Sequence, residues 1–312
     1  MNGTLIDMSG AIDLHCHPYP DLFPRLTDDV GIVEAARDAG MRAVMIKCHH
    51  ESSVSRAYLT SKLVAGPLVF GGVVLNSYVG GINPAAVEAS LRLGGKEVWM
   101  PTIDAAYHAE MHGGTGGYDS QSGGQSSATG ISTVDAAGDL RPETLEVLDL
   151  IAQHNAILGT CHLSPKEIAT LVAEARARGV QKILITHPFF KVPHLNLDEL
   201  RSLAAQGAVA EFGYCTISPM WNYATIDKVA EATQAIGARH CVLVSDTGQR
   251  HNPLPPEALR LFAQGLFEKG VPEEDIYTMI KDNPADLLEL GPPEPAVADL
   301  TSLAQASAER PA

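Results

Sequence analysis

Two histidines separated by one residue end the first apolar segment of this 312-residue sequence, which reads IDLHCHP over residues 12–18. In a β-strand, residues i and i+2 lie on the same face, so His15 and His17 point the same way and Cys16 points the other way. Two imidazoles on one face can supply half of a tetrahedral metal site. Because a His-x-His pair is common by chance, a metal centre needs further ligands elsewhere in the chain.

Three further apolar segments end in residue types that bind metals: they finish at His162, His187 and Asp246. Imidazole and carboxylate donors suit zinc, and they also bind manganese or iron. All three residues stand at the carboxyl ends of their segments, so they meet the histidine pair if the segments are parallel strands. Cys161 precedes His162, and by the alternation of a strand it is expected to face away from the ligands. The predicted metal ligands are therefore His15, His17, His162, His187 and Asp246.

Short apolar runs rich in Val and Ile alternate with helical patterns along the chain. We predict eight strands, at Ile12–His17, Ala43–Cys48, Val69–Asn76, Glu97–Thr102, Ala156–His162, Lys182–His187, Ala208–Tyr214 and Cys241–Asp246. Near-continuous apolar runs are typical of parallel strands that are buried on both faces. This alternation predicts a (β/α)8 TIM barrel, in which the carboxyl ends of the strands form the active site. A doubly wound open sheet is the alternative, but no G-x-G-x-x-G follows the first strand.

The pattern of these ligands resembles that of the amidohydrolase superfamily, which has His-x-His on strand one, His on strands five and six, and Asp on strand eight. The segment YTMIKDNPADLL at residues 277–288 is also similar to the helix that closes many members. The resemblance covers residues 10–290. It implies that residues 1–290 form a single metal-dependent hydrolase barrel from a poorly characterised branch of the superfamily.

One departure from the superfamily concerns the number of metal ions. Members with two ions usually carry a carboxylated lysine at the end of strand four, whereas Lys96 stands at the start of that strand, six residues before Thr102. That separation is about 20 Å, too far to reach the mouth of the barrel. Lys47, Cys48 and Asp104 are alternative bridging residues. We therefore expect one ion, most simply zinc, with two ions left open.

The resemblance implies a hydrolase that activates water to cleave an amide, lactone or related C–N or C–O bond of a small molecule. With one ion, the ligands are His15, His17, His162 and Asp246; Asp246 takes the proton of water, and His187 acts as an acid or polarises the carbonyl group. With two ions, His162 and His187 hold the second. A metal-dependent decarboxylase of the same superfamily is the alternative, and a metal-binding protein without turnover is a third reading.

A cation at the end of the second strand indicates an anionic substrate. Lys47 is expected to contact a carboxylate or a developing oxyanion, and the alternative is an ion pair with Glu51 or Glu211. Glu211 interrupts an apolar strand and needs a partner if it is buried, for which Lys47 is the expected choice.

Further candidates for substrate binding lie in the loops after the strands. Arg25 follows the first strand, Arg250 follows Asp246, and His108 precedes a Gly-rich segment. His49 and His50 follow Lys47, and the alternation of a strand lets only one of them face the pocket.

Two segments depart from the barrel pattern. Residues 112–130 hold seven glycines and four serines, and they are expected to form either a lid over the mouth or a surface insertion. Residues 291–312 form a Pro/Ala-rich C-terminal tail, which is expected to lie outside the core.

The composition favours a cytoplasmic enzyme that acts on small molecules. The chain holds 22 Lys and Arg against 37 Asp and Glu, a net charge of −15, which argues against a nucleic-acid partner. No segment approaches the 20 or so apolar residues of a membrane span, and the first residues lack the pattern of a secretory signal. Five scattered cysteines predict no disulfide framework. A homo-oligomer is left open.

Overall fold

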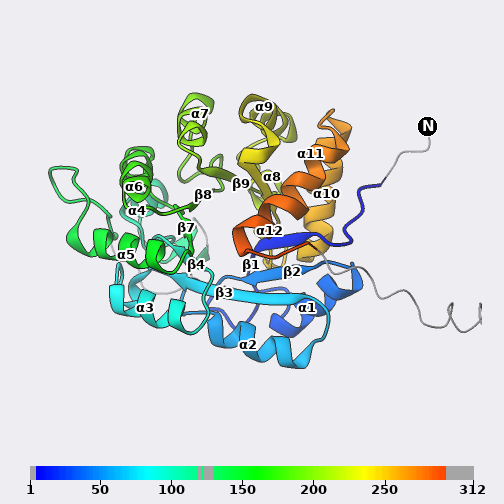
Figure 1. The fold of residues 1–312 in the computed structure, drawn as a ribbon, viewed down its shortest axis with the longest axis horizontal. Helices are drawn as coiled ribbons and strands as arrows, with labels where there is room; N and C mark the ends of the chain where they lie inside the picture. Colours follow the sequence, from blue (N-terminus) through cyan, green and yellow to red (C-terminus); the bar gives the residue numbers. More distant parts are fainter. Residues whose placement is uncertain (1–4, 119–120, 123–128, 293–312) are drawn as a thin grey trace, which may run out of the picture.

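The computed structural model describes residues 5–118, 121–122 and 129–292. In this part of the chain, eight strands follow one another around a single sheet, each pair of neighbours in the sheet order being parallel (Figure 1). The strands are β1 (Ile12–Cys16), β2 (Ala43–Ile46), β3 (Leu68–Val74), β4 (Glu97–Trp99), β7 (Ile157–Gly159), β8 (Lys182–Thr186), β9 (Val209–Gly213) and β10 (Cys241–Val244). The predicted (β/α)8 barrel is thereby confirmed.

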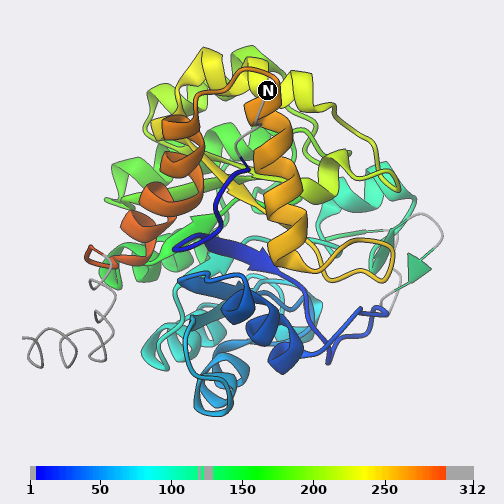
Figure 2. The same ribbon diagram turned by 90° about the vertical axis from the view of Figure 1, so that its right-hand side faces the viewer.

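Helices follow the strands and cover the outside of the barrel. They are α1 (Asp29–Asp38), α2 (Val54–Leu63), α3 (Pro84–Arg92), α4 (Ala106–His112), α5 (Pro142–Gln153), α6 (Pro165–Ala177), α7 (Leu197–Ala205), α8 (Tyr214–Ile217), α9 (Ile226–Ile236), α10 (Pro255–Glu268), α11 (Glu273–Tyr277) and α12 (Asn283–Leu288). Short 3-10 turns occupy Ser77–Val79 and Ala238–His240, and a π-helical turn occupies Thr278–Asp282. Figure 2 shows the N-terminal segment, in dark blue, between α10 and the orange C-terminal helices.

Local sequence signals explain where several of these helices begin. Ser164 and Glu167 form a reciprocal capping box around Pro165 at the start of α6, and Asn196 and Glu199 form another at α7. These side chains satisfy backbone N–H groups that have no partner within the first helical turn. The helices therefore begin soon after the strand ends that carry the candidate ligands.

Backbone hydrogen bonds close the barrel between β1 and the end of β10. The Asp246 amide donates to the His15 carbonyl oxygen at 2.9 Å, and the His17 amide donates to the Thr247 carbonyl oxygen at 2.8 Å. Gly248 lies so close to His17 that a Cβ there would clash with the His17 carbonyl oxygen, and its φ of +140° favours glycine. This closure places Asp246 beside the histidine pair.

Three residues at the mouth have left-handed backbone conformations. Cys161, His187 and Asp246, which follow β7, β8 and β10, have φ values of +50°, +30° and +48°. Such conformations cost roughly 1–2 kcal/mol for residues other than glycine, and they end the alternation of a strand. Cys161 therefore does not face away as expected, since its Sγ lies 3.7 Å from Lys47 Nζ inside the barrel.

The two segments outside the barrel pattern are only partly described. The Gly-rich segment contributes the short pair β5 (Gly117–Tyr118) and β6 (Gln121–Ser122), while residues 119–120 and 123–128 lie outside the described residues. Of the tail at 291–312, only 291–292 are described. The lid and the division of the chain into barrel and tail thus stay predictions. Within the described residues, no helix has the length and apolar character to cross a membrane.

Candidate metal centre

Three of the five predicted ligands converge on one point at the mouth of the barrel. His15 Nε2 lies 3.1 Å from His17 Nε2, and Asp246 Oδ1 lies 3.3 Å from the first and 3.2 Å from the second. All three residues are buried, with exposed fractions of 1%, 2% and 7%. The donor atoms thus form a nearly equilateral triangle.

The other ring nitrogen of each histidine faces an acceptor. His15 Nδ1 donates to Glu211 Oε1 at 2.8 Å, and His17 Nδ1 donates to the Lys47 carbonyl oxygen at 3.1 Å. With the hydrogen on Nδ1, each Nε2 carries a bare lone pair. Such outer partners fix the tautomer and orientation of metal-binding histidines.

The triangle fits a divalent metal ion in both size and charge. Ligands that lie 2.0–2.1 Å from a tetrahedral zinc are roughly 3.3 Å apart, close to the separations found here. Two imidazole lone pairs and a carboxylate oxygen at this distance repel one another unless a cation lies between them. These three donor atoms could therefore hold a metal ion.

The two remaining predicted ligands stand beside the triangle. The His162 and His187 ring centroids are 5.0 Å apart, and His187 is 6.3 Å from His15. Neither belongs to the group of donor atoms that lie within 4.8 Å of one another. The four-ligand arrangement with His162 is thus not assembled in this structure.

A chain of contacts orients His162. His108 Nε2 donates to the Gly117 carbonyl oxygen at 2.7 Å, which leaves His108 Nδ1 as an acceptor for His162 Nδ1 at 2.8 Å. The hydrogen of His162 then lies on Nδ1, and its Nε2 carries a lone pair that can bind a metal ion. His187 Nδ1 is buried and has no hydrogen-bond partner among the described residues. Both side chains can therefore serve a second ion or a reacting substrate.

Burial keeps these imidazoles neutral. It lowers the pKa of His15 to about 3, and it lowers the pKa values of His17, His162 and His187 well below the usual value. Burial also raises the pKa of Asp246, against the opposing effect of His15. Neutral imidazoles are the form that binds metals.

Lys47 and Glu211 do not form the predicted ion pair. Glu211 instead binds His15, while Lys47 Nζ lies against Cys161 Sγ and 5.3 Å from the centre of the Trp99 ring. Among the described residues, no carboxylate oxygen lies within 4.0 Å of Lys47 Nζ, although the lysine is only 1% exposed. The expected pairing is therefore wrong, because the carboxylate of Glu211, on β9, is bound by His15 from β1 instead.

A second buried glutamate was missed by the sequence analysis. Glu97, on β4, is fully buried, and neither of its carboxyl oxygens has a hydrogen-bond partner among the described residues. Burial, with the charge of Glu211, raises the pKa of Glu97 well above its usual value, and burial raises that of Glu211 to about 7. Glu97 therefore holds its proton more tightly than Glu211 does. Glu211 is the one of the two that ionises more readily, and its carboxylate accepts the hydrogen bond from His15. The signal was available, since both residues interrupt apolar strands.

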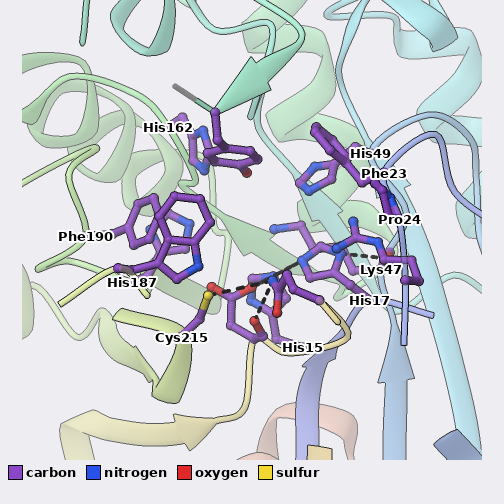
Figure 3. Close-up of a pocket in the computed structure, with 15 residues that line it drawn as sticks. His15, His17, Phe23, Pro24, Lys47, His49, His162, His187, Phe190 and Cys215 are labelled. Carbon is purple, nitrogen blue, oxygen red and sulfur yellow. Dashed lines mark hydrogen bonds and ion pairs between the residues drawn. The ribbon is translucent and has the colours of Figure 1, made fainter. Parts of the chain in front are cut away.

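The pocket above the triangle has aromatic walls. Figure 3 shows Phe190 and His187 on one side of the pocket and Phe23, Pro24 and His49 on the other. Residues that sequence reasoning missed complete the walls; they are Tyr118 in β5, Cys215 in α8, and Trp221 and Gln249 in loops. All four lie outside the eight strands of the barrel, so the strand pattern could not place them.

Of the predicted substrate contacts, Arg25, Lys47 and His49 line the pocket. Asp21 Oδ2 accepts from Arg25 Nε at 3.0 Å and from Nη2 at 2.8 Å. Arg25 Nη1 makes no hydrogen bond to a residue in the described part of the chain, so this nitrogen is available to a ligand.

Other predicted residues lie outside the pocket. Arg250 is exposed, and its Nε donates to the Arg25 carbonyl oxygen. His108 stands behind His162, and Asp104 Oδ2 accepts from the Ser77 amide and hydroxyl. Of His49 and His50, only His49 lines the pocket, while His50 Nδ1 lies 3.2 Å from Asp21 Oδ1.

Several solved structures are similar to this fold. The amidohydrolase from Pseudomonas aeruginosa is 13% identical with a TM-score of 0.60, and the match covers 90% of this chain and 96% of that one. The Escherichia coli phosphotriesterase homology protein, complexed with phosphate in its active site, is 13% identical with a TM-score of 0.56 and coverages of 90% and 99%. The 2,6-dihydroxybenzoate decarboxylase from Rhizobium is 12% identical with a TM-score of 0.51 and coverages of 91% and 99%.

The sequence matches no curated protein, but residues 10–211 match a family described as a family of unknown function, DUF6282. That match spans more than half of the chain, and it includes four of the five predicted ligands. The structural similarities confirm the resemblance to amidohydrolases at the level of the fold. This chain belongs to the DUF6282 family, on an amidohydrolase-like (β/α)8 barrel.

Proposed function

We propose that this protein is a metal-dependent hydrolase that cleaves a C–N or C–O bond next to a carbonyl group in a small anionic molecule. The observation that carries the proposal is the triangle of His15 Nε2, His17 Nε2 and Asp246 Oδ1. A divalent ion held there, most simply zinc, would lower the pKa of water from 15.7 toward 7 and polarise a carbonyl group.

The side chains around the triangle support the steps of hydrolysis. Asp246 has one oxygen in the triangle, and its carboxylate can take the proton of the attacking water and return it to the leaving group. His187 lies beside the triangle with an unpartnered ring nitrogen, and it can hold the carbonyl oxygen of the substrate as negative charge develops.

Two cations at the pocket support an anionic substrate. Lys47 is buried and has no carboxylate within 4.0 Å among the described residues, and Arg25 lines the same pocket from the loop after β1. The Cys161 sulfur and the Trp99 ring beside Lys47 Nζ carry no full negative charge, so a carboxylate on the substrate would stabilise the buried cation. The aromatic walls would contact the remaining apolar part of such a molecule.

The same two cations favour a decarboxylase as the second candidate function. Such an enzyme also holds a carboxylate, and the fold is similar to that of the Rhizobium decarboxylase. In either case we propose that the protein works in the cytoplasm, which agrees with five free cysteines.

Product analysis tests the proposal. The zinc-loaded protein is incubated with a panel of N-acyl amino acids, lactone carboxylates and aromatic carboxylates, and the products are identified by mass spectrometry. Hydrolysis adds one water: it converts an N-acyl amino acid into a carboxylic acid and a free amino acid, and a lactone into one hydroxy acid heavier by one water. Decarboxylation releases carbon dioxide. A metal-loaded protein that converts no member of either class, or chelator-treated protein that is equally active, would contradict the proposal.

A further inference from the structure

A second group of metal-binding side chains lies outside the pocket. Asp21, Cys48 and His50 bring one carboxylate oxygen, one sulfur and one ring nitrogen within 4.8 Å of one another. Asp21 belongs to the loop between β1 and α1, while Cys48 and His50 follow β2. His49, between them, points into the pocket in Figure 3, whereas neither Cys48 nor His50 lines that pocket.

These three side chains are almost completely withdrawn from solvent. Cys48 is 2% exposed, and the side chains of Asp21 and His50 are 0% and 8% exposed. Neither ring nitrogen of His50 has a hydrogen bond of acceptable geometry among the described residues. Nδ1 still has an ion-pair partner in Asp21, whereas Nε2 has no polar partner among the described residues. A buried ring nitrogen without a partner is unfavourable, and a bound group at this site would satisfy it.

The distance between the His50 and Asp21 ligand atoms matches the spacing of two ligands on one metal ion. His50 Nδ1 lies 3.2 Å from Asp21 Oδ1, although the angles do not suit a hydrogen bond. Two ligands of a tetrahedral zinc are roughly 3.3 Å apart, so these atoms stand where two ligands would stand.

Charge around the group also suits a cation. Asp21 Oδ2 is held by Arg25, while Oδ1 accepts from the Phe23 amide at 2.9 Å and keeps a second lone pair that can bind a metal ion. The neighbouring guanidinium of Arg56 is already bound to Asp29 and Glu51. A carboxylate oriented by a second partner is the usual arrangement around a metal-binding oxygen.

We propose that Asp21, Cys48 and His50 form a second metal site, separate from the triangle, that takes zinc or a similar divalent ion with affinity for thiolate. Binding removes the proton of the Cys48 thiol and leaves a fourth position for water. The ion links the loop after β1 to the end of β2, and through Asp21 it holds Arg25 at the wall of the pocket.

Cobalt substitution tests this site without any enzyme assay, because a thiolate bound to Co2+ gives an intense near-ultraviolet absorption that nitrogen and oxygen ligands do not. The metal-free full-length protein is titrated with cobalt chloride. We expect the thiolate absorption in the native protein and in His17→Ala, which lacks a ligand of the triangle. Cys48→Ser should lose the absorption and bind one cobalt fewer, with an unchanged far-ultraviolet circular dichroism spectrum.

Two other cysteines provide the controls. Cys241→Ser changes a buried thiol whose Sγ contacts the Gly237 carbonyl oxygen, and Cys161→Ser changes the thiol beside Lys47; both variants should keep the absorption. Native protein without the absorption overturns the proposal, whether or not any variant folds. An absorption that survives in Cys48→Ser, or that disappears in Cys161→Ser, overturns it as well. These outcomes are independent of the hydrolase proposal, which depends on the triangle.

Discussion

His15 Nδ1 and Glu211 Oε1 meet at 2.8 Å inside the barrel, one from β1 and the other from β9. Both side chains are buried, with exposed fractions of 1% and 0%. The contact fixes the hydrogen of His15 on Nδ1 and turns Nε2 toward His17 and Asp246. Glu211 is therefore a positioning residue for the metal centre, although it does not reach the triangle itself.

Glu211→Gln should weaken metal binding. The amide keeps the size of the side chain and an accepting oxygen, but it loses the charge that increases the basicity of His15. We expect a 10–100-fold lower metal affinity, the usual effect of removing such a partner. Competition with a chromophoric chelator measures it, and Glu257→Gln, on the exposed face of α10, is the matched control. Equal affinities in the two variants would contradict the role of Glu211.

His17→Ala should abolish metal binding at the triangle and with it the activity, while the barrel stays folded. The ligand is lost, but a buried core of this size does not depend on a metal ion for folding. Elemental analysis and thermal unfolding measure the two effects. His154→Ala, at the exposed end of α5, should change neither. A His17→Ala protein that keeps the catalytic metal would contradict the ligand assignment.

Arg25→Lys should raise KM about 10–100-fold with little change in kcat, once a substrate is known. A lysine cannot bind Asp21 with two nitrogens and present a third to the substrate, and loss of a charged hydrogen bond has an effect of this size. Steady-state kinetics measure both constants. Arg201→Lys, on the exposed side of α7, serves as the control. An unchanged KM would place the substrate carboxylate elsewhere, with Lys47 the next candidate.

Much of this architecture follows from simple patterns in the sequence. The apolar segments and the caps at Ser164 and Asn196 predict the barrel and its helix starts, because buried parallel strands and capped helices have local signatures. The convergence of His15, His17 and Asp246 follows as well, since parallel strands bring their carboxyl ends together, whereas His162 and His187 lie beside this group.

What the sequence could not show depends on contacts between distant residues. His15 and Lys47 compete for Glu211, and only the packing inside the barrel decides between them. Left-handed conformations at Cys161 and His187 have no signature in residues that favour ordinary backbone angles, so alternation misplaced the Cys161 sulfur. The aromatic walls come from loops, whose paths depend on the finished barrel.

Asp13→Asn should remove part of the pH dependence of stability. Asp13 Oδ1 accepts from the His15 and Ser245 amides, but burial raises the pKa of Asp13 from 3.8 to about 6. The folded state thus binds this proton more tightly than the unfolded state. The contribution of this proton to the free energy of unfolding is complete below pH 4. It is lost as the pH rises through 6, which lowers the free energy of unfolding by about 3 kcal/mol.

Urea unfolding between pH 4 and 8 measures this contribution as the difference between the native protein and Asp13→Asn. The free energy of unfolding of the native protein should fall relative to that of the variant as the pH rises, because an asparagine has no proton to lose. A difference that stays constant with pH, or that changes in the opposite direction, would mean that Asp13 is ionised in the folded protein throughout this range.

Asp246→Asn separates metal binding from proton transfer. The amide keeps an oxygen in place of Oδ1, so the variant should retain much of its metal, whereas it cannot accept the proton of water. We expect activity to fall by a factor on the order of 10² or more, the usual contribution of a general base. The activity of the native enzyme should also decline on the acid side of its pH profile, where the carboxylate becomes protonated. Elemental analysis together with initial rates distinguishes the two effects. If Asp246→Asn binds metal and works at the native rate, the base lies elsewhere, and His187, whose Nδ1 has no partner among the described residues, is the residue to replace next.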